Sequence, residues 1–393
     1  MTHEPDYSTL PLNTYEFAFP VLKKREEPFE VVKKISDEIG PRPVTSIAEA
    51  QVAAFMGGRL RRAGMQVWSD PFYTHMQTGT GAFSVAVLAA AVVIMWGNQR
   101  EYALASAIVA FLIAIITTSA RLMRIGQRQH ESQNVVATQA SLSPPTRRVV
   151  LLAPLDSHQP SDPLSNREAR VGATAALLTF ACIEFFAPLP LPELLRLIIM
   201  ATPAVYLVVA ASAELWVRSQ PYSPGAVSYA SALATMLTVI EDVGRLPKTE
   251  IWAVGLGGGS TGAGLRELLK RYPFDRRATF FIGLEGIGRG SLSYIINDHS
   301  ERQRSADSLL VDLVTEATFG VRAEPRIATF PVLVRPLVQS GRRAISIACL
   351  DNQGRVPLQG SPKDTSVAVN ASLLEQTARL VANTVRGIDT SDI

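Results

Sequence analysis

Two short polar segments follow buried strands and carry side chains that could do chemistry. Asp156-Ser157-His158 follows the apolar run TRRVVLLAP (146–154), and Glu285 follows ATFFIGL (278–284). Carboxylates and imidazole are zinc ligands and acid–base groups. Asp156, His158 and Glu285 are therefore candidates for a single-metal site.

The other histidines and the serines suggest no second catalytic centre. His75 and His130 flank apolar stretches and are expected at a membrane interface, while His299 lies in a turn, NDHSE. No arrangement of His, Cys and Ser resembles a nucleophilic triad.

A glycine-rich segment, GLGGGSTGAG (255–264), connects an expected strand to an expected helix. Backbone N–H groups at such a junction can bind an anion. However, no Lys-Ser/Thr pair follows in P-loop spacing, and no acidic residue stands cleanly about 20 residues further on. The segment is therefore interpreted as a structural loop rather than a phosphate site.

Strands and helices alternate through the polar part of the chain. Helices are expected at 47–63, 225–243, 264–272 and 372–386, and buried strands at 146–154, 250–256, 278–284 and 344–350. Such alternation predicts an α/β fold with a mostly parallel sheet flanked by helices. Asp364 and Thr365 are expected to cap the turn before the last helix.

The composition excludes several classes of protein. Of 393 residues, 47% are hydrophobic and 19% are charged, against about 25% charged in ordinary domains. This apolar content excludes intrinsic disorder, and two cysteines exclude a disulfide scaffold. The net charge of +3 gives no indication of nucleic-acid binding.

Four apolar stretches predict membrane-spanning helices, because a bilayer core needs about 20 apolar residues in a helix. They lie between His75 and Arg100, at 102–120, at 171–189 and at 197–213. The third contains Glu184 near its end, where a carboxylate can reach the headgroups or stay protonated. Short turns join the stretches into two hairpins, so both hairpins return the polar chain to one side.

Basic residues near the span ends predict which side that is. Arg100 and Arg196 lie at the short turns, against six arginines beside the polar part: Arg121, Arg124, Arg128, Arg167, Arg170 and Arg218. This excess predicts an integral membrane protein with four spans and a cytoplasmic polar domain. Cys182 and Cys349 are then expected to be reduced thiols.

The spans divide the chain into five segments. We expect an N-terminal arm and the first part of the α/β domain at 1–76, hairpin 1 at 77–120 and the second part at 121–170. Hairpin 2 follows at 171–216, and the remainder of the domain at 217–393.

Six segments, in this order, resemble the di-zinc aminopeptidases of metallopeptidase family 28, the aminopeptidase Y type. The resemblance implies a zinc-aminopeptidase-like fold interrupted by two transmembrane hairpins. The segments that carry it are IGPRPVTSIAEAQVAAFMGGRLRRAGMQV, RRVVLLAPLDSH, SPGAVSYASALATML, TEIWAVGLGGGSTGAG, FFIGLEGIGRG and GSPKDTSVAVNASLLEQTARLVANTV.

Carried across residue by residue, the resemblance also implies that most of the metal site is replaced. Asp156, which orients the first ligand, and the acidic ligand Glu285 are retained. The family's first His falls on Pro154, its bridging Asp on Ser228, its Glu-Glu pair of base and ligand on Gly259 and Ser260, and its last His on Gly360. Gly and Pro side chains cannot bind zinc, so two metals could not be held.

These observations predict a membrane-anchored pseudo-peptidase, a binding or assembly subunit without a cofactor. Its expected partners are the lipid bilayer, another membrane protein or a second copy, and a peptide as ligand of the pocket; nucleic acid is not expected. The alternative is an active membrane zinc aminopeptidase with a single metal at Asp156, His158 and Glu285. A transport or channel component is a third reading, but Glu184 alone offers little pathway for an ion.

Overall fold

The computed structural model describes residues 27–75, 86, 88–90, 92, 100–118, 129–159, 167–186, 191–298 and 305–391. Eight strands within these residues form one sheet, in the order β1-β2-β4-β3-β5-β8-β6-β7. Their bounds are β1 Gln66–His75, β2 Gln129–Gln139, β3 Arg147–Pro154, β4 Thr249–Leu256, β5 Thr279–Leu284, β6 Ser291–Asp298, β7 Glu324–Ala328 and β8 Arg343–Leu350.

The sheet is mixed, with four parallel and three antiparallel pairings of neighbouring strands. The four predicted strands, β3, β4, β5 and β8, form the parallel centre. β1 pairs antiparallel with β2, and β6 antiparallel with β8. The β1–β2 register ends at the pair His75 and Gln129, on either side of the first predicted hairpin. An insertion that returns the chain to its starting point makes the flanking strands antiparallel.

Helices cover both faces of the sheet because its central strands are apolar on both sides. Along β3, Val149 and Leu151 face one cluster, while Val150 and Leu152 face the other. The larger cluster lies under α1 Pro28–Lys33, α2 Ile47–Arg62, α7 Ser231–Val243, α9 Ser308–Ala317 and α11 Ala371–Thr390. The smaller lies under α8 Ala263–Arg271 and α10 Arg335–Gln339. Short helical turns complete the domain: η1 Lys34–Ile39, η3 Ala226–Ala230, η4 Gly259–Thr261 and η5 Ser366–Ala368.

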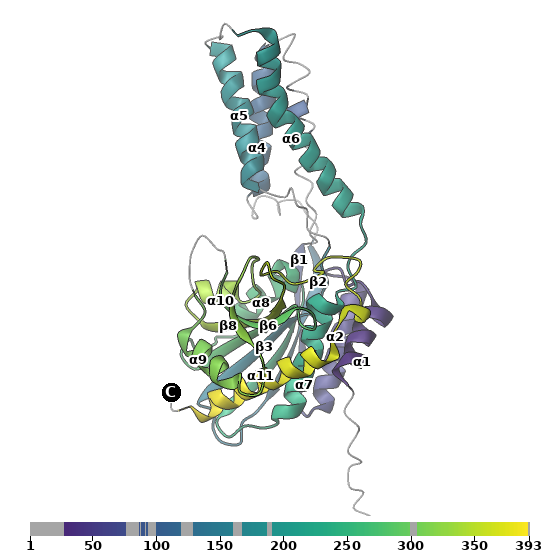
Figure 1. Cartoon of the computed structure of the whole chain (residues 1–393), viewed down its shortest axis with the longest axis vertical. Helices are drawn as coiled ribbons and strands as arrows, with labels where there is room; N and C mark the ends of the chain where they lie inside the picture. Colours follow the sequence, from purple (N-terminus) through teal and green to yellow (C-terminus); the bar gives the residue numbers. More distant parts are fainter. Residues whose placement is uncertain are drawn as a thin grey trace, which may run out of the picture.

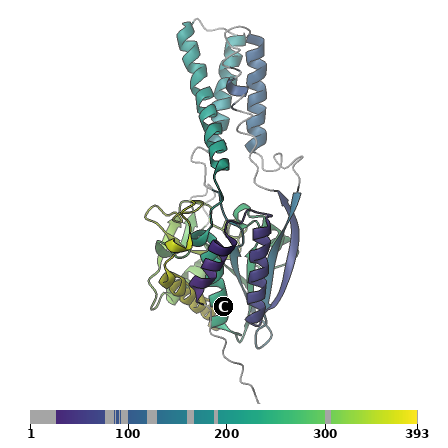
Figure 2. The same cartoon turned by 90° about the vertical axis from the view of Figure 1, so that its right-hand side faces the viewer.

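A bundle of helices stands beyond one end of the α/β domain (Figures 1 and 2). It contains α4 Arg100–Thr118, α5 Arg167–Phe186 and α6 Glu193–Ser219. Small side chains such as Ala107, Ala181 and Ala204 are buried between them, which allows close helix contact. Ala86, Ala89 and Val92, at helical spacing, are buried in the same cluster.

Three helices in the described part of the chain are long and apolar enough to cross a membrane. One, Ala226–Val243, has 89% of its residues buried, and its apolar side chains form the core of the α/β domain. The other two, Ala169–Phe186 and Leu194–Val217, bury only 28% each. α4 contributes a shorter apolar helix, and most of the first predicted span lies outside the described residues.

Glu184 lies inside the bundle rather than at its surface. Its side chain is 1% exposed, and the Arg196 Nε lies 3.5 Å from a carboxylate oxygen. An ionisable group in apolar surroundings is usually paired in this way. Within the bundle Glu184 therefore lies beside Arg196, and whether its carboxylate reaches lipid headgroups or stays protonated remains a prediction.

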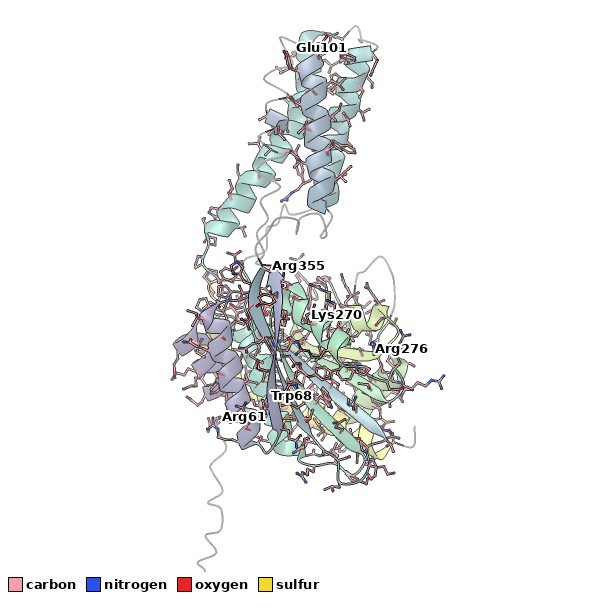
Figure 3. The ribbon with its side chains drawn as sticks, turned by 180° about the vertical axis from the view of Figure 1, so that it is seen from behind. Arg61, Trp68, Glu101, Lys270, Arg276 and Arg355 are labelled. Carbon is pink, nitrogen blue, oxygen red and sulfur yellow. The ribbon has the colours of Figure 1, made fainter. Side chains whose placement is uncertain are left out.

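The end of the domain that faces the bundle carries the carboxyl ends of the parallel strands. Figure 3 shows Arg355, just beyond β8, at this end, and Arg61, at the C-terminal end of α2, at the opposite one. Glu101 marks the end of the bundle remote from the domain (Figure 3). The loops after β3, β4, β5 and β8 are therefore gathered at the end that faces the bundle.

Candidate functional site

The residues predicted from the sequence lie in loops at the carboxyl ends of three adjacent strands. β4, β3 and β5 are parallel neighbours, so the segments that follow them meet at one edge. Asp156 is fully buried there, and the Ser260 N–H donates to its carboxylate oxygens at 3.3 and 3.1 Å. Burial raises the pKa of Asp156 to about 6.

The position that the sequence resemblance assigns to a general base, Gly259, is closed. A Cβ placed on Gly259 would lie 2.6 Å from the Pro154 Cβ and 3.1 Å from an Asp156 oxygen. Carbon atoms do not approach to 2.6 Å without a shift of the backbone or ring. Pro154 and Gly259 therefore pack against each other, and position 259 has no room for a side chain.

Ser228, at the position of the bridging Asp, donates its hydroxyl to Asp364 at 2.7 Å. The same carboxylate accepts the N–H groups of Val227 and Ser228, and the Ser223 hydroxyl lies 3.4 Å away. The Asp364 carboxylate thus caps η3 rather than the turn before the last helix, which corrects the expectation for Asp364. Thr365 does stand at the N-cap of that turn, η5, although its side chain makes no capping hydrogen bond.

Gly360, at the position of the last His, turns the chain with a φ of +73°. Glycine adopts this left-handed conformation without strain. Position 360 therefore serves the course of the loop and supplies no ligand.

Arg42 of the Gly-Pro-Arg-Pro turn is fully buried beneath these loops. Its guanidinium donates to the carbonyls of Ile35, Gly40, Leu155, Pro224 and Gly225. Burial lowers its pKa to about 10, so the side chain stays charged at neutral pH. Sequence reasoning did not single out Arg42; the available signal was an arginine between two prolines in an expected tight turn.

Glu49 is a buried acid of the site that sequence reasoning missed. It lies in the first turn of α2, and its carboxylate accepts the N–H groups of Thr45 and Gly258 at 2.6 and 2.7 Å and the Ser132 hydroxyl at 3.1 Å. Burial, and then the nearby charge of Asp156, raise its pKa to about 7. The available signal was Ser46-x-x-Glu49, a capping box before an apolar helix.

Glu285 accepts hydrogen bonds from the Leu333 N–H at 2.8 Å and the Ser346 hydroxyl at 3.0 Å. Burial raises its pKa to about 7. Like Asp156 and Glu49, this retained acid accepts hydrogen bonds from the protein's own donors.

Tyr229 follows Ser228 in the chain and contacts the side chain of His158. Its hydroxyl contacts the His158 Nε2, and the two rings lie 5.1 Å apart. Burial lowers the pKa of His158 to about 4, so the imidazole is neutral at physiological pH. Burial, with Asp156 and Glu285 nearby, raises the pKa of Tyr229 well above its usual value. Sequence reasoning missed Tyr229, because a lone tyrosine after a replaced ligand carries no motif.

The described residues around these loops do not form a zinc site. Across the described part of the chain, no group of three or more His, Cys, Asp and Glu side chains is placed to hold a metal. Asp156, His158 and Glu285 form no such group. His130 is exposed on β2, His75 ends β1, and His299 lies outside the described residues.

Three solved structures resemble this architecture. The zinc aminopeptidase BSAP from Bacillus subtilis is 12% identical, with 91% of this chain and 93% of that chain covered and a TM-score of 0.57. A Zn-dependent exopeptidase from Parabacteroides distasonis is 14% identical, with 93% and 97% covered and a TM-score of 0.56. A glutaminyl cyclase from Fimbriiglobus ruber is 10% identical, with 92% and 94% covered and a TM-score of 0.53.

The chain has a zinc-aminopeptidase-like fold. No protein-family model matches its sequence, and no curated protein matches it. Identities this low show the fold alone, so the fold predicted from the six ordered segments is confirmed. The narrower assignment to family 28, aminopeptidase Y type, and the loss of its ligands remain predictions.

Proposed function

We propose that this chain is a membrane-anchored pseudo-peptidase that serves as a binding or assembly subunit and does not hydrolyse peptides. The observation that carries the proposal is the contact between Pro154 and Gly259. It leaves no room for a side chain at position 259, to which the resemblance assigns the general base. Ser228 likewise donates to Asp364 and offers a metal only a hydroxyl.

Two observations support the membrane anchor. α5 and α6 are apolar over 18 and 24 residues, with most of each helix exposed in the isolated chain. Leu194, Val205 and Trp216 of α6 are 59–69% exposed, an arrangement that suits contact with lipid. The excess of arginines on the polar side supports a cytoplasmic α/β domain.

Metal content tests the proposal first. Full-length protein is purified in detergent, incubated with zinc, desalted and analysed by elemental mass spectrometry. We expect less than about 0.1 zinc per chain, whereas a catalytic site of this class would hold about one or two. Hydrolysis of aminoacyl chromogenic substrates, measured on the same sample, is expected to be absent.

The Glu285→Ala variant is the control for a single-metal enzyme. One zinc per chain that is lost in this variant would support the alternative site at Asp156, His158 and Glu285. Two zinc ions per chain, or peptide hydrolysis, would contradict the proposal. Co-purification from native membranes then identifies the partner, for which another membrane protein and a second copy are the candidates.

A further inference from the structure

The chain leaves and re-enters the α/β domain at the candidate site when it makes the hairpin α5–α6. The segment after β3, residues 155–159, leads towards α5. The segment after α6, residues 220–230, leads through η3 into α7. Both segments contain residues at former catalytic positions, Asp156 on the first and Ser228 on the second.

The two segments are bonded directly to each other. The Ser223 N–H donates to the His158 carbonyl at 3.0 Å. The Tyr229 hydroxyl contacts the His158 Nε2, and the two rings are in contact. Tyr229 is only 4% exposed, so water does not compete with this contact.

The Arg42 side chain is hydrogen-bonded to both segments. Its side chain donates to the Leu155 carbonyl at 3.1 Å on the first segment and to the Pro224 carbonyl at 2.8 Å on the second. Its backbone exchanges two hydrogen bonds with Ser157, at 2.9 and 2.8 Å. A fully buried guanidinium with several acceptors is a rigid connector, because each lost bond would leave a buried polar group unpaired.

Little chain separates α6 from this set of contacts. α6 ends at Ser219, and only residues 220–223 precede Pro224. Four residues span at most about 14 Å when fully extended. α6 also extends towards the domain beyond the other helices of the bundle (Figure 1). A displacement of α6 is therefore transmitted to the bonded segments.

We propose that Arg42, Ser157, His158, Ser223 and Tyr229 form a joint that fixes hairpin α5–α6 in one orientation on the α/β domain. A partner that tilts or shifts α6 changes the loops of the former catalytic site through this joint. The inference deepens the proposed function, because it assigns to the loops after β3 and before α7 the role of connecting the proposed membrane hairpin to the α/β domain. It rests on the proposal that the bundle lies in a membrane.

The test compares two tyrosines that are equally buried. Tyr229 and Tyr294 are each 4% exposed; the Tyr229 hydroxyl contacts His158 and is hydrogen-bonded to the Gln359 side chain, and the Tyr294 hydroxyl contacts Thr315 at 3.0 Å. Tyr229→Phe removes a contact of the joint, and Tyr294→Phe removes a comparable contact between β6 and α9. The full chain is reconstituted in lipid nanodiscs for both variants.

Two readouts are measured. Spin labels at Val205→Cys on α6 and Lys270→Cys on α8, with Cys182 and Cys349 replaced by Ala, give the distance distribution between bundle and domain. Hydrogen exchange is followed in peptides covering residues 220–230. Loss of one buried hydrogen bond is expected to speed local opening there by about two- to tenfold.

We expect Tyr229→Phe to broaden the distance distribution and speed this exchange, and Tyr294→Phe to change neither. A Tyr229→Phe protein indistinguishable from the parent would overturn the inference, and so would equal broadening in Tyr294→Phe. His158→Phe, which keeps a ring but removes the nitrogen, gives a second reading if Tyr229→Phe does not fold. Zinc binding would overturn the pseudo-peptidase proposal without changing either readout, so the two failures are distinguishable.

Discussion

Gly259→Ala measures directly whether the catalytic position is closed. The new Cβ would lie 2.6 Å from the Pro154 Cβ, and Pro154 is buried at the end of β3, where its ring has little freedom to move. Added atoms in a packed interior cost about 1–3 kcal/mol. For a domain of this size each kcal/mol lowers the thermal midpoint by about 2–4 °C, so we expect a fall of about 2–12 °C.

Tryptophan fluorescence can follow the α/β domain separately from the bundle. Trp68 and Trp252 pack edge to face in this domain, with ring centroids 6.1 Å apart, and Figure 3 shows Trp68 on the sheet. The chain has four tryptophans. Replacing Trp96 and Trp216, which lie in the two predicted hairpins, by Phe leaves a signal from the domain alone.

Gly58→Ala is the matched control, because a Cβ at Gly58 in α2 meets no atom within 4 Å. Alanine is favoured over glycine inside a helix by roughly 0.5–1 kcal/mol, so this variant should melt at or slightly above the parent. If Gly259→Ala had the same thermal midpoint as Gly58→Ala, position 259 would have room for a side chain. The argument for a closed site would then be refuted.

Three further changes test other parts of the structure. In Glu49→Gln we expect the thermal midpoint to fall less between pH 5 and pH 8 than it does in the parent. The folded-state pKa of Glu49 is raised to about 7, so its stabilising contribution of up to about 3 kcal/mol is present below about pH 4.5 and is lost as the pH rises through 7. An unchanged pH dependence of the midpoint would contradict this. Arg42→Met should cost about 3–5 kcal/mol in a denaturation assay, because it leaves buried carbonyls without a donor; a loss below 1 kcal/mol would disprove their dependence on this side chain. Arg196→Met should lower the thermal midpoint of the bundle, which Trp216 fluorescence reports, and adding Glu184→Leu should restore it. If the double variant did not recover, the loss of stability would not come from leaving Glu184 without Arg196.

The central strands could be predicted because each is a short apolar run buried on both faces, such as Val149–Leu152 in β3. The outer strand β1 could not, since its sequence QVWSDPFYTH mixes polar residues with a proline and has one exposed edge. β1 is defined by its pairing with β2, and the two are separated in sequence by the first hairpin. Local pattern carries no information about such pairing.

The sequence predicted which positions lack a ligand side chain, but not how those positions pack. That Gly259 contacts Pro154, or that Glu49 reaches the Gly258 N–H, depends on how distant loops meet at the end of the sheet. The sequence also presented Asp364 as a local cap, whereas its partners are more than 130 residues away. Long-range contacts of this kind follow from tertiary packing alone.

The positions at which the hairpins interrupt the domain bear on how such an anchor can be acquired. The first interruption begins and ends at register partners, His75 and Gln129, and the second lies between His158 and Ser223, which share a backbone hydrogen bond. Two neighbouring positions that already touch can accept an insertion whose main free-energy cost is the entropy of closing the loop. This cost grows slowly with the length of the insertion. The proposed membrane segments can thus be removed, in principle, without breaking the pairing of the aminopeptidase-like sheet. Short turns in their place should yield a water-soluble domain with the same sheet.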